Sequence, residues 1–430
     1  MADVSTPAQT SAPADESSEP AGPPWSTLPT HRHWLQAERD RLLRFHEHHA
    51  FDAAVGFAPL DVAGSPIRRA PRDLYLNARL VHCFAIEHLL GRPGAAAIAQ
   101  HGLRALQTVF HDTEHGGWFA AVNPDGTPAD TSKSAYGHAF VVLAAASATQ
   151  AGLVGGRVLL DEALATIDDH LWREDEGAVI DSCHRDWTIA EPEYRGQNAN
   201  MHLTEAYMAA AEATDDHQLR RRAEGIATKL INHHAREWQW RVPEHFDQDW
   251  NVVPSFNIDR PHDQFRPYGA LVGHWFEWAR LVLALHQLPN SRVPWAQEAA
   301  IGLFQRGVTD GWDPTNGGIV YSTDFTGRVI NADRMHWAIA EGVGAAVFLA
   351  AATDDPQYEH WYRTFWDEIE HHLIDRRLGS WLHQTGPDGS FKGDTWPGKP
   401  DLYHAWQATL YACANPSVGL AEAARTGRMH

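Results

Sequence analysis

Six stretches of small and apolar residues recur along the chain, and each carries polar or aromatic side chains at a comparable place. One residue in each serves as a marker, and successive markers lie about 65 residues apart, a near-constant long period that is typical of stacked supersecondary units. About 65 residues is room for a helical hairpin with its loops. The stretches are 77–90, 134–146, 198–213, 270–285, 334–350 and 402–412, with the markers Arg79, Tyr136, His202, His274, Trp337 and His404.

Charged, amphipathic segments alternate with these stretches, as in residues 218–235 and 295–308, and their apolar positions recur at helical spacing. Helices that are apolar nearly all round, such as 134–146 and 338–350, belong inside a fold, where amphipathic helices cover them. We therefore predict an all-α fold in which six helical hairpins close a double ring. One helix of each hairpin would line the interior, so that the six markers converge on one pocket.

The connecting segments share a second pattern. A Gly is followed by a strand-like apolar or aromatic tripeptide and then by a turn that contains Asp, Pro or Gly. We interpret these segments as short β-hairpins at one mouth of the ring. They cover residues 115–126, 316–327 and 378–390, with looser versions at 177–187 and 246–253.

The ends of the chain differ from its middle. Residues 1–24 are rich in Pro, Ala, Ser and acidic residues and lack a basic start or an apolar centre, which indicates a disordered N-terminal tail rather than a signal peptide. We predict that residues 25–415 form a single (α/α)6-barrel catalytic domain, with the first helix near residues 33–49. Residues 416–430 are expected to be a C-terminal tail.

Charge and composition limit the range of possible functions. The net charge of −20 argues against nucleic acid or an anionic membrane as a partner. The odd number of cysteines, Cys83, Cys183 and Cys413, favours a reduced compartment, and hence the cytoplasm, over a disulfide framework. The 18 Trp residues suit stacking on sugar rings, and the 28 His residues suit proton transfer near neutral pH. Monomer and homo-oligomer both stay open.

Two His-x-x-Glu pairs stand on the predicted inner helices. His274 and Glu277 are three residues apart, so they share a helix face, where a carboxylate can fix the tautomer of an imidazole and raise its basicity. His202 and Glu205 repeat the spacing in the preceding unit. Asn198 lies one turn before His202 and either faces the same pocket or caps the helix.

His404 and Arg79 are further candidates. The Pro-Gly-Lys-Pro sequence at 397–400 makes a rigid loop, and Asp401 can cap the helix that follows, so His404 falls in its first turn near the pocket mouth. Arg79 stands in an apolar helix, where it must meet an acid or line a wet pocket. In a pocket, its guanidinium could hold a developing oxyanion.

No metal or cofactor is expected. The two His-x-x-Glu pairs raise the question of zinc, which needs about three protein ligands and an open position. However, neither His-Glu-x-x-His nor a cysteine-containing pattern occurs. The glycine-containing segments 92–96 and 152–156 lack the Lys-Ser/Thr that completes a phosphate loop.

Together these stretches resemble the N-acylglucosamine 2-epimerase superfamily, and within it the aldose–ketose isomerases that act on mannose or sulfoquinovose. The resemblance covers residues 30–412 and is most specific at 396–410 (WPGKPDLYHAWQATL) and 273–281 (GHWFEWARL). It implies an (α/α)6 barrel that acts without a metal and uses two histidines for acid–base work. By position His274, assisted by Glu277, and His404 are that pair. The matching substrate-binding shell is Arg79, Tyr136, Asn198, His202, Glu277, Trp337, Glu341 and Gln384, and Tyr75 stands where the family often has Trp.

The resemblance implies a metal-independent isomerase that interconverts D-mannose and D-fructose through a cis-enediol(ate), with D-lyxose and D-xylulose as a further pair. That reaction needs a base with a near-neutral pKa, a second acid–base group to open the ring, and donors for the enediolate oxygen. A free aldohexose is favoured over a sulfonated sugar, since the binding segments show no surplus of Arg or Lys.

Three alternatives stay open. A sugar 2-epimerase of the N-acylglucosamine or cellobiose type would use the same two histidines on the two faces of C2. An (α/α)6 glycoside hydrolase would need two carboxylates, for which Glu277 and Glu341 are the candidates. A non-catalytic sugar-binding protein would need only the aromatic residues.

The two histidines are expected to differ in role. The loop before His404 fixes its position, and a group that moves a proton between adjacent carbons needs placement above all. Glu277 near His274 makes the protonation of that imidazole adjustable, which suits proton transfer on sugar oxygens. We therefore assign the C2–C1 proton to His404 and ring opening to His274.

Overall fold

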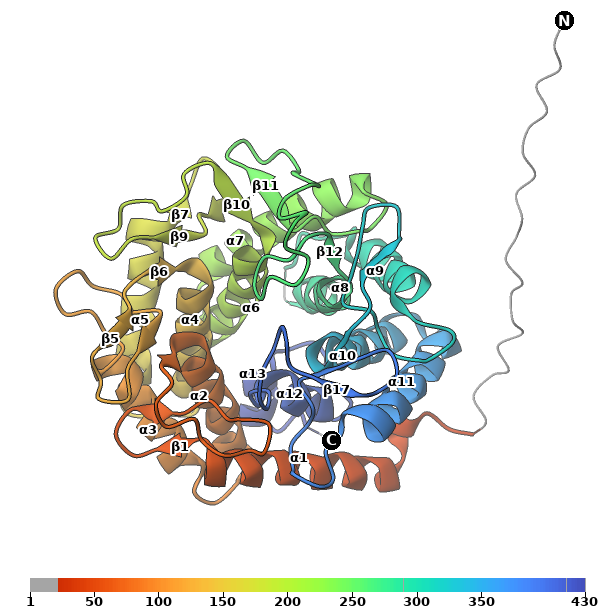
Figure 1. Cartoon of the computed structure of the whole chain (residues 1–430), viewed down its shortest axis with the longest axis horizontal. Helices are drawn as coiled ribbons and strands as arrows, with labels where there is room; N and C mark the ends of the chain where they lie inside the picture. Colours follow the sequence, from red (N-terminus) through yellow and green to blue (C-terminus); the bar gives the residue numbers. More distant parts are fainter. Residues whose placement is uncertain (1–21, 289, 415, 430) are drawn as a thin grey trace, which may run out of the picture.

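The six markers lie on six helices that form the inner layer of a double ring (Figure 1). The computed structural model describes residues 22–429 except 289 and 415, so the tail predicted for residues 1–24 lies largely outside the described part. Each inner helix packs on the next, and α12 packs on α2, which closes the ring. The inner helices are α2 (Leu74–Leu89), α4 (Ala135–Gln150), α6 (Gln197–Thr214), α8 (Val272–Gln287), α10 (His336–Thr353) and α12 (Tyr403–Tyr411).

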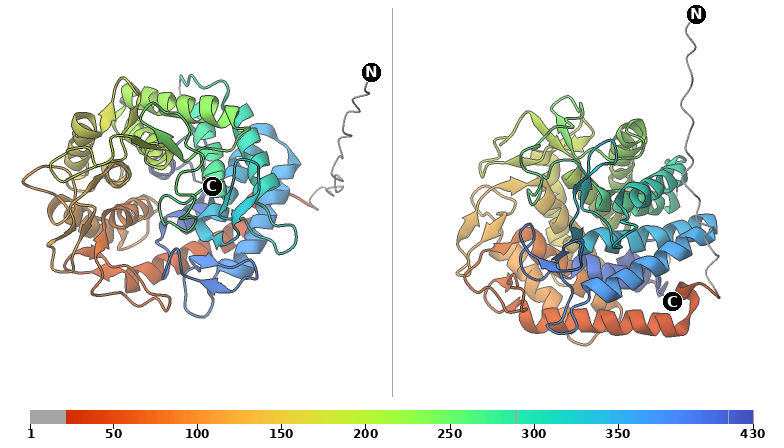
Figure 2. Two further views of the ribbon diagram at one scale, coloured as in Figure 1. Left: turned by 45° about the horizontal axis from the view of Figure 1, so that its top comes forward. Right: turned by 45° about the vertical axis from the view of Figure 1, so that its right-hand side comes forward.

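The outer helices cover the inner ring. Each of five outer helices packs against the inner helix that precedes it, whereas α1 packs against α12, so the two ends of the chain complete the sixth pair. Helix α1 runs along the outside of the ring, as Figure 1 and the right-hand view of Figure 2 show. These helices are α1 (Pro29–His49), α3 (Ala95–Thr108), α5 (Gly156–Thr166), α7 (His217–Ala227), α9 (Ala296–Gly311) and α11 (Pro356–Glu368). The predicted fold class is confirmed.

Some helices carry short non-α extensions. A single 3₁₀ turn, η1 (Trp25–Thr27), precedes α1. Helices α5, α7 and α11 each continue into a π-helical segment, namely η2 (Ile167–Leu171), η3 (Thr228–Ala235) and η4 (Ile369–Leu373). Such segments, with i→i+5 hydrogen bonds, are rare and frequently occur at functional sites.

The inner helices α4 and α10 are buried over nearly their whole length, as their composition predicts. Among the described helices, α10 is long and apolar enough by composition to cross a membrane, with a mean hydropathy of 1.3 over 18 residues. Of the residues in this stretch 72% are buried, because α8, α11 and α12 pack around the helix. Its apolar character therefore serves the barrel interior. All three cysteines are free and buried, while the cytoplasmic location stays a prediction.

The strands are two or three residues long and antiparallel, and five of them lead directly into an inner helix. These five are β3 (Arg72–Asp73), β6 (Lys133–Ser134), β10 (Tyr194–Gly196), β12 (Ala270–Leu271) and β15 (Arg334–Met335). Each pairs with a strand from a connecting segment. The sheets therefore gather at the N-terminal ends of the inner helices and anchor them there.

The predicted hairpins complete these sheets. The order is β3-β4-β5, β12-β13-β14 and β15-β16-β17 in the three-stranded sheets, and β1-β2, β6-β9, β7-β8 and β10-β11 in the others. The turns of the three clear hairpins span 123–127, 324–328 and 386–390, at or just past the end of each predicted window. The remaining strands are β1 (Phe51–Asp52), β2 (Gly56–Phe57), β4 (Ala121–Val122), β5 (Pro128–Asp130), β7 (Trp172–Arg173), β8 (Ala178–Val179), β9 (Ser182–Cys183), β11 (His245–Asp247), β13 (Ser322–Thr323), β14 (Val329–Asn331), β16 (Gln384–Thr385) and β17 (Phe391–Lys392).

The C-terminal segment departs from the predicted tail over 416–430. Residues 420–425 form α13 (Leu420–Arg425), which packs against α2, α4 and α6. Its alanines Ala421, Ala423 and Ala424 are buried. The helix covers apolar surface left at the C-terminal ends of the inner helices, and its small side chains allow the close approach. A six-residue helix carries too little periodicity to be predicted from sequence.

Close packing between α8 and α10 gives a test of the barrel. A Cβ on Gly273 would lie 2.3 Å from the ring of Trp337 and 2.9 Å from the backbone of Ala338. We expect Gly273→Ala to lower the free energy of unfolding by about 1–3 kcal/mol through overpacking. Gly225, an exposed helical glycine where an added Cβ would meet nothing within 4 Å, is the matched control. Gly225→Ala should be neutral or stabilise by about 0.4–1 kcal/mol. Urea denaturation measures both, and equal effects would contradict the packing argument.

Candidate active site

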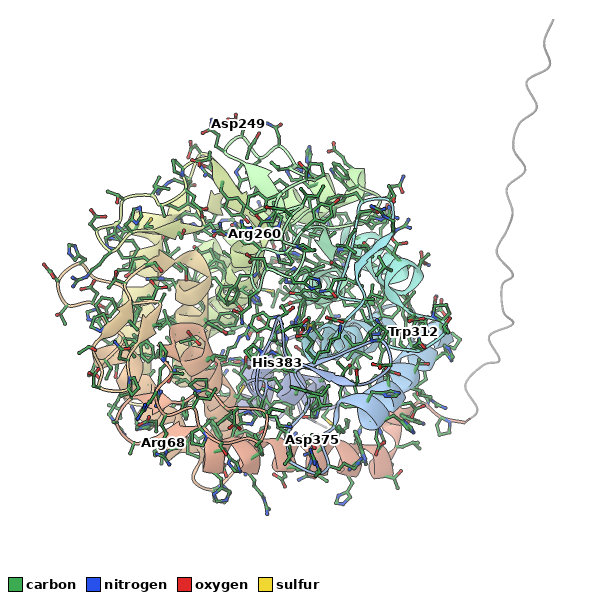
Figure 3. The ribbon with its side chains drawn as sticks, viewed as in Figure 1. Arg68, Asp249, Arg260, Trp312, Asp375 and His383 are labelled. Atoms are coloured by element: carbon green, nitrogen blue, oxygen red, sulfur yellow. The ribbon has the colours of Figure 1, made fainter. Side chains whose placement is uncertain are left out.

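The first two turns of the six inner helices surround a cavity of about 350 Å³. This volume lies at the lower end of the roughly 300–1,000 Å³ that small-molecule sites occupy. All six markers line it, as the sequence predicts, and so do Asn198 and Glu277. His383, another lining residue, lies near the centre of the ring, whereas Arg68 and Trp312 lie towards the rim (Figure 3).

His404 is held by Glu341. Its Nδ1 lies 2.9 Å from Oε1 of Glu341, and both side chains are buried. Burial opposes ionisation of Glu341, but Arg280 and His404 outweigh it and lower the pKa of that carboxyl to about 2. A carboxylate can only accept, so Nδ1 donates and Nε2 is left as the acceptor. Burial lowers the pKa of His404 although Glu341 raises it, so the imidazole is a neutral base.

His274 has a different partner from the one predicted. Its Nδ1 lies 3.0 Å from both carboxylate oxygens of Glu244, a residue just before β11. Burial works against the charge of Glu244, yet His274 and the amide of Gln197 hold the pKa of this carboxyl below its usual range. The predicted pairing with Glu277 is therefore wrong. Residues three apart share a helix face, but the imidazole turns toward the adjacent loop.

Trp337 packs against both imidazoles. Its ring centroid is 5.0 Å from that of His274 and 5.9 Å from that of His404. Because the Nδ1 atom of each histidine is held by a carboxylate, Nε2 of each ring is free for a ligand in the cavity. The pair can thus exchange protons with two positions of one small molecule.

Glu277, His202 and Asn198 form a polar wall. Nδ1 of His202 lies 3.7 Å from Oε1 of Glu277. Burial, reinforced by the charge of Glu341, raises the pKa of Glu277 well above its usual range, and burial lowers the pKa of His202 well below its own. Both are therefore neutral, and Glu277 can donate a hydrogen bond.

The same wall is short of hydrogen-bond partners. Oδ1 of Asn198, Nδ1 of His202 and both carboxyl oxygens of Glu277 are buried without one in the described structure. Asn198 lies inside α6 and does not cap it, since its side chain bonds to no backbone N–H there. Hydroxyl groups both donate and accept, so a ligand rich in hydroxyls would satisfy this wall.

Arg79 meets an acid and also lines the cavity, so both outcomes foreseen for it occur. Its guanidinium donates to Oδ2 of Asp401 at 2.8 Å and to the hydroxyl of Tyr136 at 2.9 Å. Oδ1 of Asp401 accepts from the backbone N–H of Tyr403, the cap that the sequence predicts. Burial opposes the charge of Asp401, but Arg79 lowers the pKa of this carboxyl to about 2. The pair joins α2 to the start of α12.

Arg280 lies at the centre of a buried charge network. Its Nε is 3.0 Å from Oε2 of Glu341, and its Nη1 is 3.5 Å from Oε1 of Glu205. Its Nη2 is 3.9 Å from Glu277. His202, Glu205 and Glu277 could each offer a ligand atom to a metal. However, a guanidinium already lies among these carboxyl groups and Glu277 is protonated, so this donor set suits a metal poorly.

Glu341 and Gln384 lie behind the cavity wall rather than in it. Gln384 accepts hydrogen bonds from the backbone N–H groups of Thr395 and Trp396 at 3.1 and 3.0 Å. Its Nε2 donates to Asp333 at 2.8 Å. It therefore holds the loop that carries Trp396, which does line the cavity. Of these two predicted shell residues, Glu341 thus contacts His404 and Gln384 contacts this loop.

The sequence did not single out several residues of the site. Phe265, from the long loop between β11 and β12, packs on Tyr75 and Trp396 across the mouth, with ring centroids 6.0 and 5.4 Å away. Arg280 carries the same signal as Arg79, a charge inside an apolar helix. Glu244 and Phe265 stand in connecting segments and have no periodic signal. His336 and His383 also line the cavity and were likewise missed.

Comparison with known proteins is consistent with this geometry. The family model for N-acylglucosamine 2-epimerase matches residues 56–408. The D-mannose isomerase of Thermobifida fusca is 44% identical over 90% of this chain and 95% of the relative. The D-mannose isomerase of Pseudomonas cannabina pv. alisalensis is 42% identical over 93% of this chain and 96% of its own.

A solved structure agrees in fold. The crystal structure of a D-mannose isomerase superposes with a TM-score of 0.83 at 30% identity, and the match covers 88% of this chain and 97% of that one. The double ring and its connectivity are therefore shared over almost the whole length of both proteins.

The carboxylate behind His404 gives a pH-dependent prediction. Glu341 raises the pKa of His404, so Glu341→Gln, which keeps a hydrogen-bond acceptor but removes the charge, should lower it further. The imidazole would then become protonated at a lower pH than in the wild type. Nitrogen-15 NMR titration of labelled histidine measures this, with His404→Gln used to assign the signal.

The matched control is Glu205→Gln. Glu205 also pairs with Arg280 but makes no hydrogen bond to His404, so the titration of His404 should stay close to that of the wild type. An upward shift in Glu341→Gln, or equal shifts in the two variants, would contradict the assigned coupling.

Proposed function

The chain belongs to the N-acylglucosamine 2-epimerase family, and from this premise we propose that it is an aldose–ketose isomerase that interconverts D-mannose and D-fructose. Relatives at 42–44% identity over most of both chains bear the name D-mannose isomerase. The observation that carries the proposal is the pair of buried imidazoles, His274 and His404. Each has a carboxylate on Nδ1, and both lie against Trp337.

His404 moves the carbon-bound proton. In the open-chain aldose, Nε2 of His404 takes the proton from C2, the C1 carbonyl becomes an enediolate oxygen, and a double bond forms between C1 and C2. The same nitrogen returns the proton to C1, while the proton of the O2 hydroxyl passes to O1 and C2 becomes the ketone carbon. A neutral base in a fixed position supports this role.

Donors around the cavity stabilise the enediolate. Arg79 carries a full charge, and protonated Glu277 can donate a hydrogen bond. The N-termini of all six inner helices also point at the cavity, and each carries a partial positive charge of about half an electron. Preorganised positive charge of this kind favours the anionic intermediate over the neutral sugar.

His274 serves ring opening and transfer between sugar oxygens. It takes the proton of the O1 hydroxyl and delivers a proton to the ring oxygen as the C1–O5 bond breaks. Glu244 on Nδ1 fixes the tautomer for this exchange. Glu277 acts instead as a neutral donor beside His202, which changes the role that the sequence suggested for it.

The preferred substrate is a free monosaccharide without an acidic group. The two cationic side chains that line the cavity are already paired, Arg79 with Asp401 and Lys399 with Asp375. A sulfonated sugar would need an unpaired cation. D-Lyxose and D-xylulose present the same C1 and C2 chemistry. We propose catalysis without a metal, since a guanidinium lies where the acidic donor set would have to bind one.

A 2-epimerase on the same barrel is the second candidate, because both imidazoles flank Trp337 and could address opposite faces of C2.

The hydrolase alternative is disfavoured. It requires one ionised and one protonated carboxyl group across the scissile bond, whereas Glu341 is bound to Arg280 and His404 behind the wall.

Product analysis tests the reaction. We expect purified protein in excess EDTA to convert D-mannose into D-fructose, because the imidazoles and Arg79 supply every proton transfer and charge. Chromatography of the equilibrated mixture measures the products, and His404→Ala is the control for contaminating activity. Formation of glucose without fructose would assign the epimerase reaction. Loss of activity in chelator that a divalent ion restores would contradict metal independence.

Solvent exchange tests how the proton transfers are divided between His274 and His404. In deuterium oxide, an open-chain analogue that bypasses ring opening should exchange its C2 proton in His274→Ala and not in His404→Ala, because we assign the C2 proton to His404 alone. Both variants should lower kcat on mannose by at least ~10²-fold, the scale of general acid–base groups. NMR measures the exchange and circular dichroism checks the fold. The opposite exchange pattern would reverse the two roles.

A further inference from the structure

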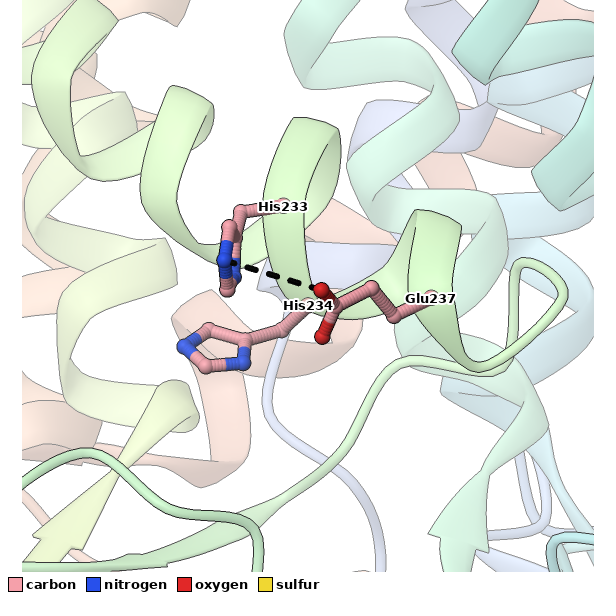
Figure 4. A group of neighbouring side chains, drawn as sticks. All are labelled: His233, His234 and Glu237. Carbon is pink, nitrogen blue, oxygen red and sulfur yellow. Dashed lines mark ion pairs between the residues drawn. The ribbon is translucent and has the colours of Figure 1, made fainter.

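A cluster of three metal-ligating side chains lies outside the barrel cavity, at the end of η3. His233, His234 and Glu237 each offer a ligand atom, and these atoms lie within 4.8 Å of one another. Figure 4 shows the Glu237 carboxylate beside both imidazoles, with His233 and Glu237 joined as an ion pair. We propose that this cluster is a binding site for a zinc-type transition-metal ion on the outer layer of the barrel, separate from the catalytic cavity.

The backbone brings the three side chains together. Residues 236 and 237 continue the helix beyond η3, so Glu237 lies one turn after His233, and Nε2 of His233 is 3.7 Å from Oε1 of Glu237. His234 is buried and packs on Phe246, with ring centroids 4.8 Å apart, and its ring is 4.6 Å from that of His233. A fixed inner ligand is thus combined with two ligands at the surface.

The distances between the ligand atoms are close to those around a bound zinc ion. Zinc binds nitrogen and oxygen ligands at about 2.0–2.2 Å, which places two ligands of a tetrahedron about 3.4 Å apart. The side chains of His233 and Glu237 are 62% and 63% exposed, so rotation about their own bonds closes the remaining gap. Two imidazoles and one carboxylate are donors that suit zinc, copper and nickel.

Two neighbouring cations are engaged elsewhere rather than with the Glu237 carboxylate. Arg236 is bound to Glu298 at 2.6 Å, and the ammonium of Lys229 lies over the ring of Trp250 at 4.3 Å. The cluster opens into a surface cavity of about 1,000 Å³ that Trp238 and Trp250 also line. Three protein ligands and an open side leave one coordination position for water or a small ligand.

The barrel itself supplies a comparison. Segment η4 ends another outer helix and also carries adjacent histidines, His371 and His372. There the ring centroids are 6.3 Å apart, and the nearby carboxylate, Glu368, precedes the pair and lies 3.9 Å from His372 alone. Within the described residues, no three-ligand group forms at that segment. The arrangement at η3 is therefore not a general consequence of two histidines in a π-helical turn.

Zinc titration of metal-free protein tests the site. Full-length protein is stripped with chelator, exchanged into chelator-free buffer and titrated with zinc chloride by calorimetry. We expect one zinc per chain at the strongest site. His233→Ala and Glu237→Gln, both at exposed positions that the fold tolerates, should each weaken that binding at least tenfold. His372→Ala is the matched control and should bind as the wild type does.

Two outcomes would overturn the proposal. One is the absence of a stoichiometric site in the wild type. The other is equal zinc affinity in the wild type and in His233→Ala, which would assign binding to other surface histidines. Mannose turnover is measured in parallel without zinc, and Glu237→Gln should leave it unchanged, since Glu237 lies outside the catalytic cavity. A negative result for zinc binding therefore does not contradict the proposed isomerase activity. A negative result for mannose turnover likewise does not contradict the zinc site.

Discussion

The buried guanidinium of Arg280 is the constraint on which the floor of the candidate active site depends. A charge without water is tolerated only when opposite charge surrounds it. Arg280 on α8 meets Glu341 on α10 and Glu205 on α6, and it packs over the ring of Tyr411 on α12. Four of the six inner helices are thus tied to one side chain beneath the cavity. The same network keeps Glu341 ionised, and Glu341 in turn fixes the tautomer of His404. Structural and chemical demands are therefore met by one set of contacts.

The parallel direction of the inner helices has a second consequence. All six N-termini reach the same mouth, where short strands lead into five of them. Side chains in the first turns must then point at a common space, and the partial positive charges of the helix ends add there. The opposite mouth receives the C-terminal ends and is covered by α13. The ring thus has a positively biased end at the candidate site and an opposite end that α13 closes.

The sequence predicted the ring and its pocket because both rest on periodic patterns. The six marker residues recur at nearly constant spacing, and all six line one cavity. The hydrogen-bond partners of the site residues were harder to predict. His274 and Glu277 share a helix face, as predicted, yet His274 bonds to Glu244 in a connecting segment, and Glu277 faces His202. Spacing along one helix shows which residues share a face. The direction in which an imidazole turns depends instead on the side chains of neighbouring segments that pack against that face.

By itself, the sequence determined the fold class, the inner and outer helices, the hairpins at one mouth and the residues that converge there, because local periodicity and burial preferences encode them. Only the tertiary structure decided the pairing of α1 with α12, the helix α13 at the base and the partners of each buried charge. It also decided that Glu341 and Gln384 lie behind the wall. The physical reason is common to these cases. A buried polar group takes whichever partner the packed helices bring within hydrogen-bonding distance, and residues far apart in the chain meet there without leaving a pattern in the sequence.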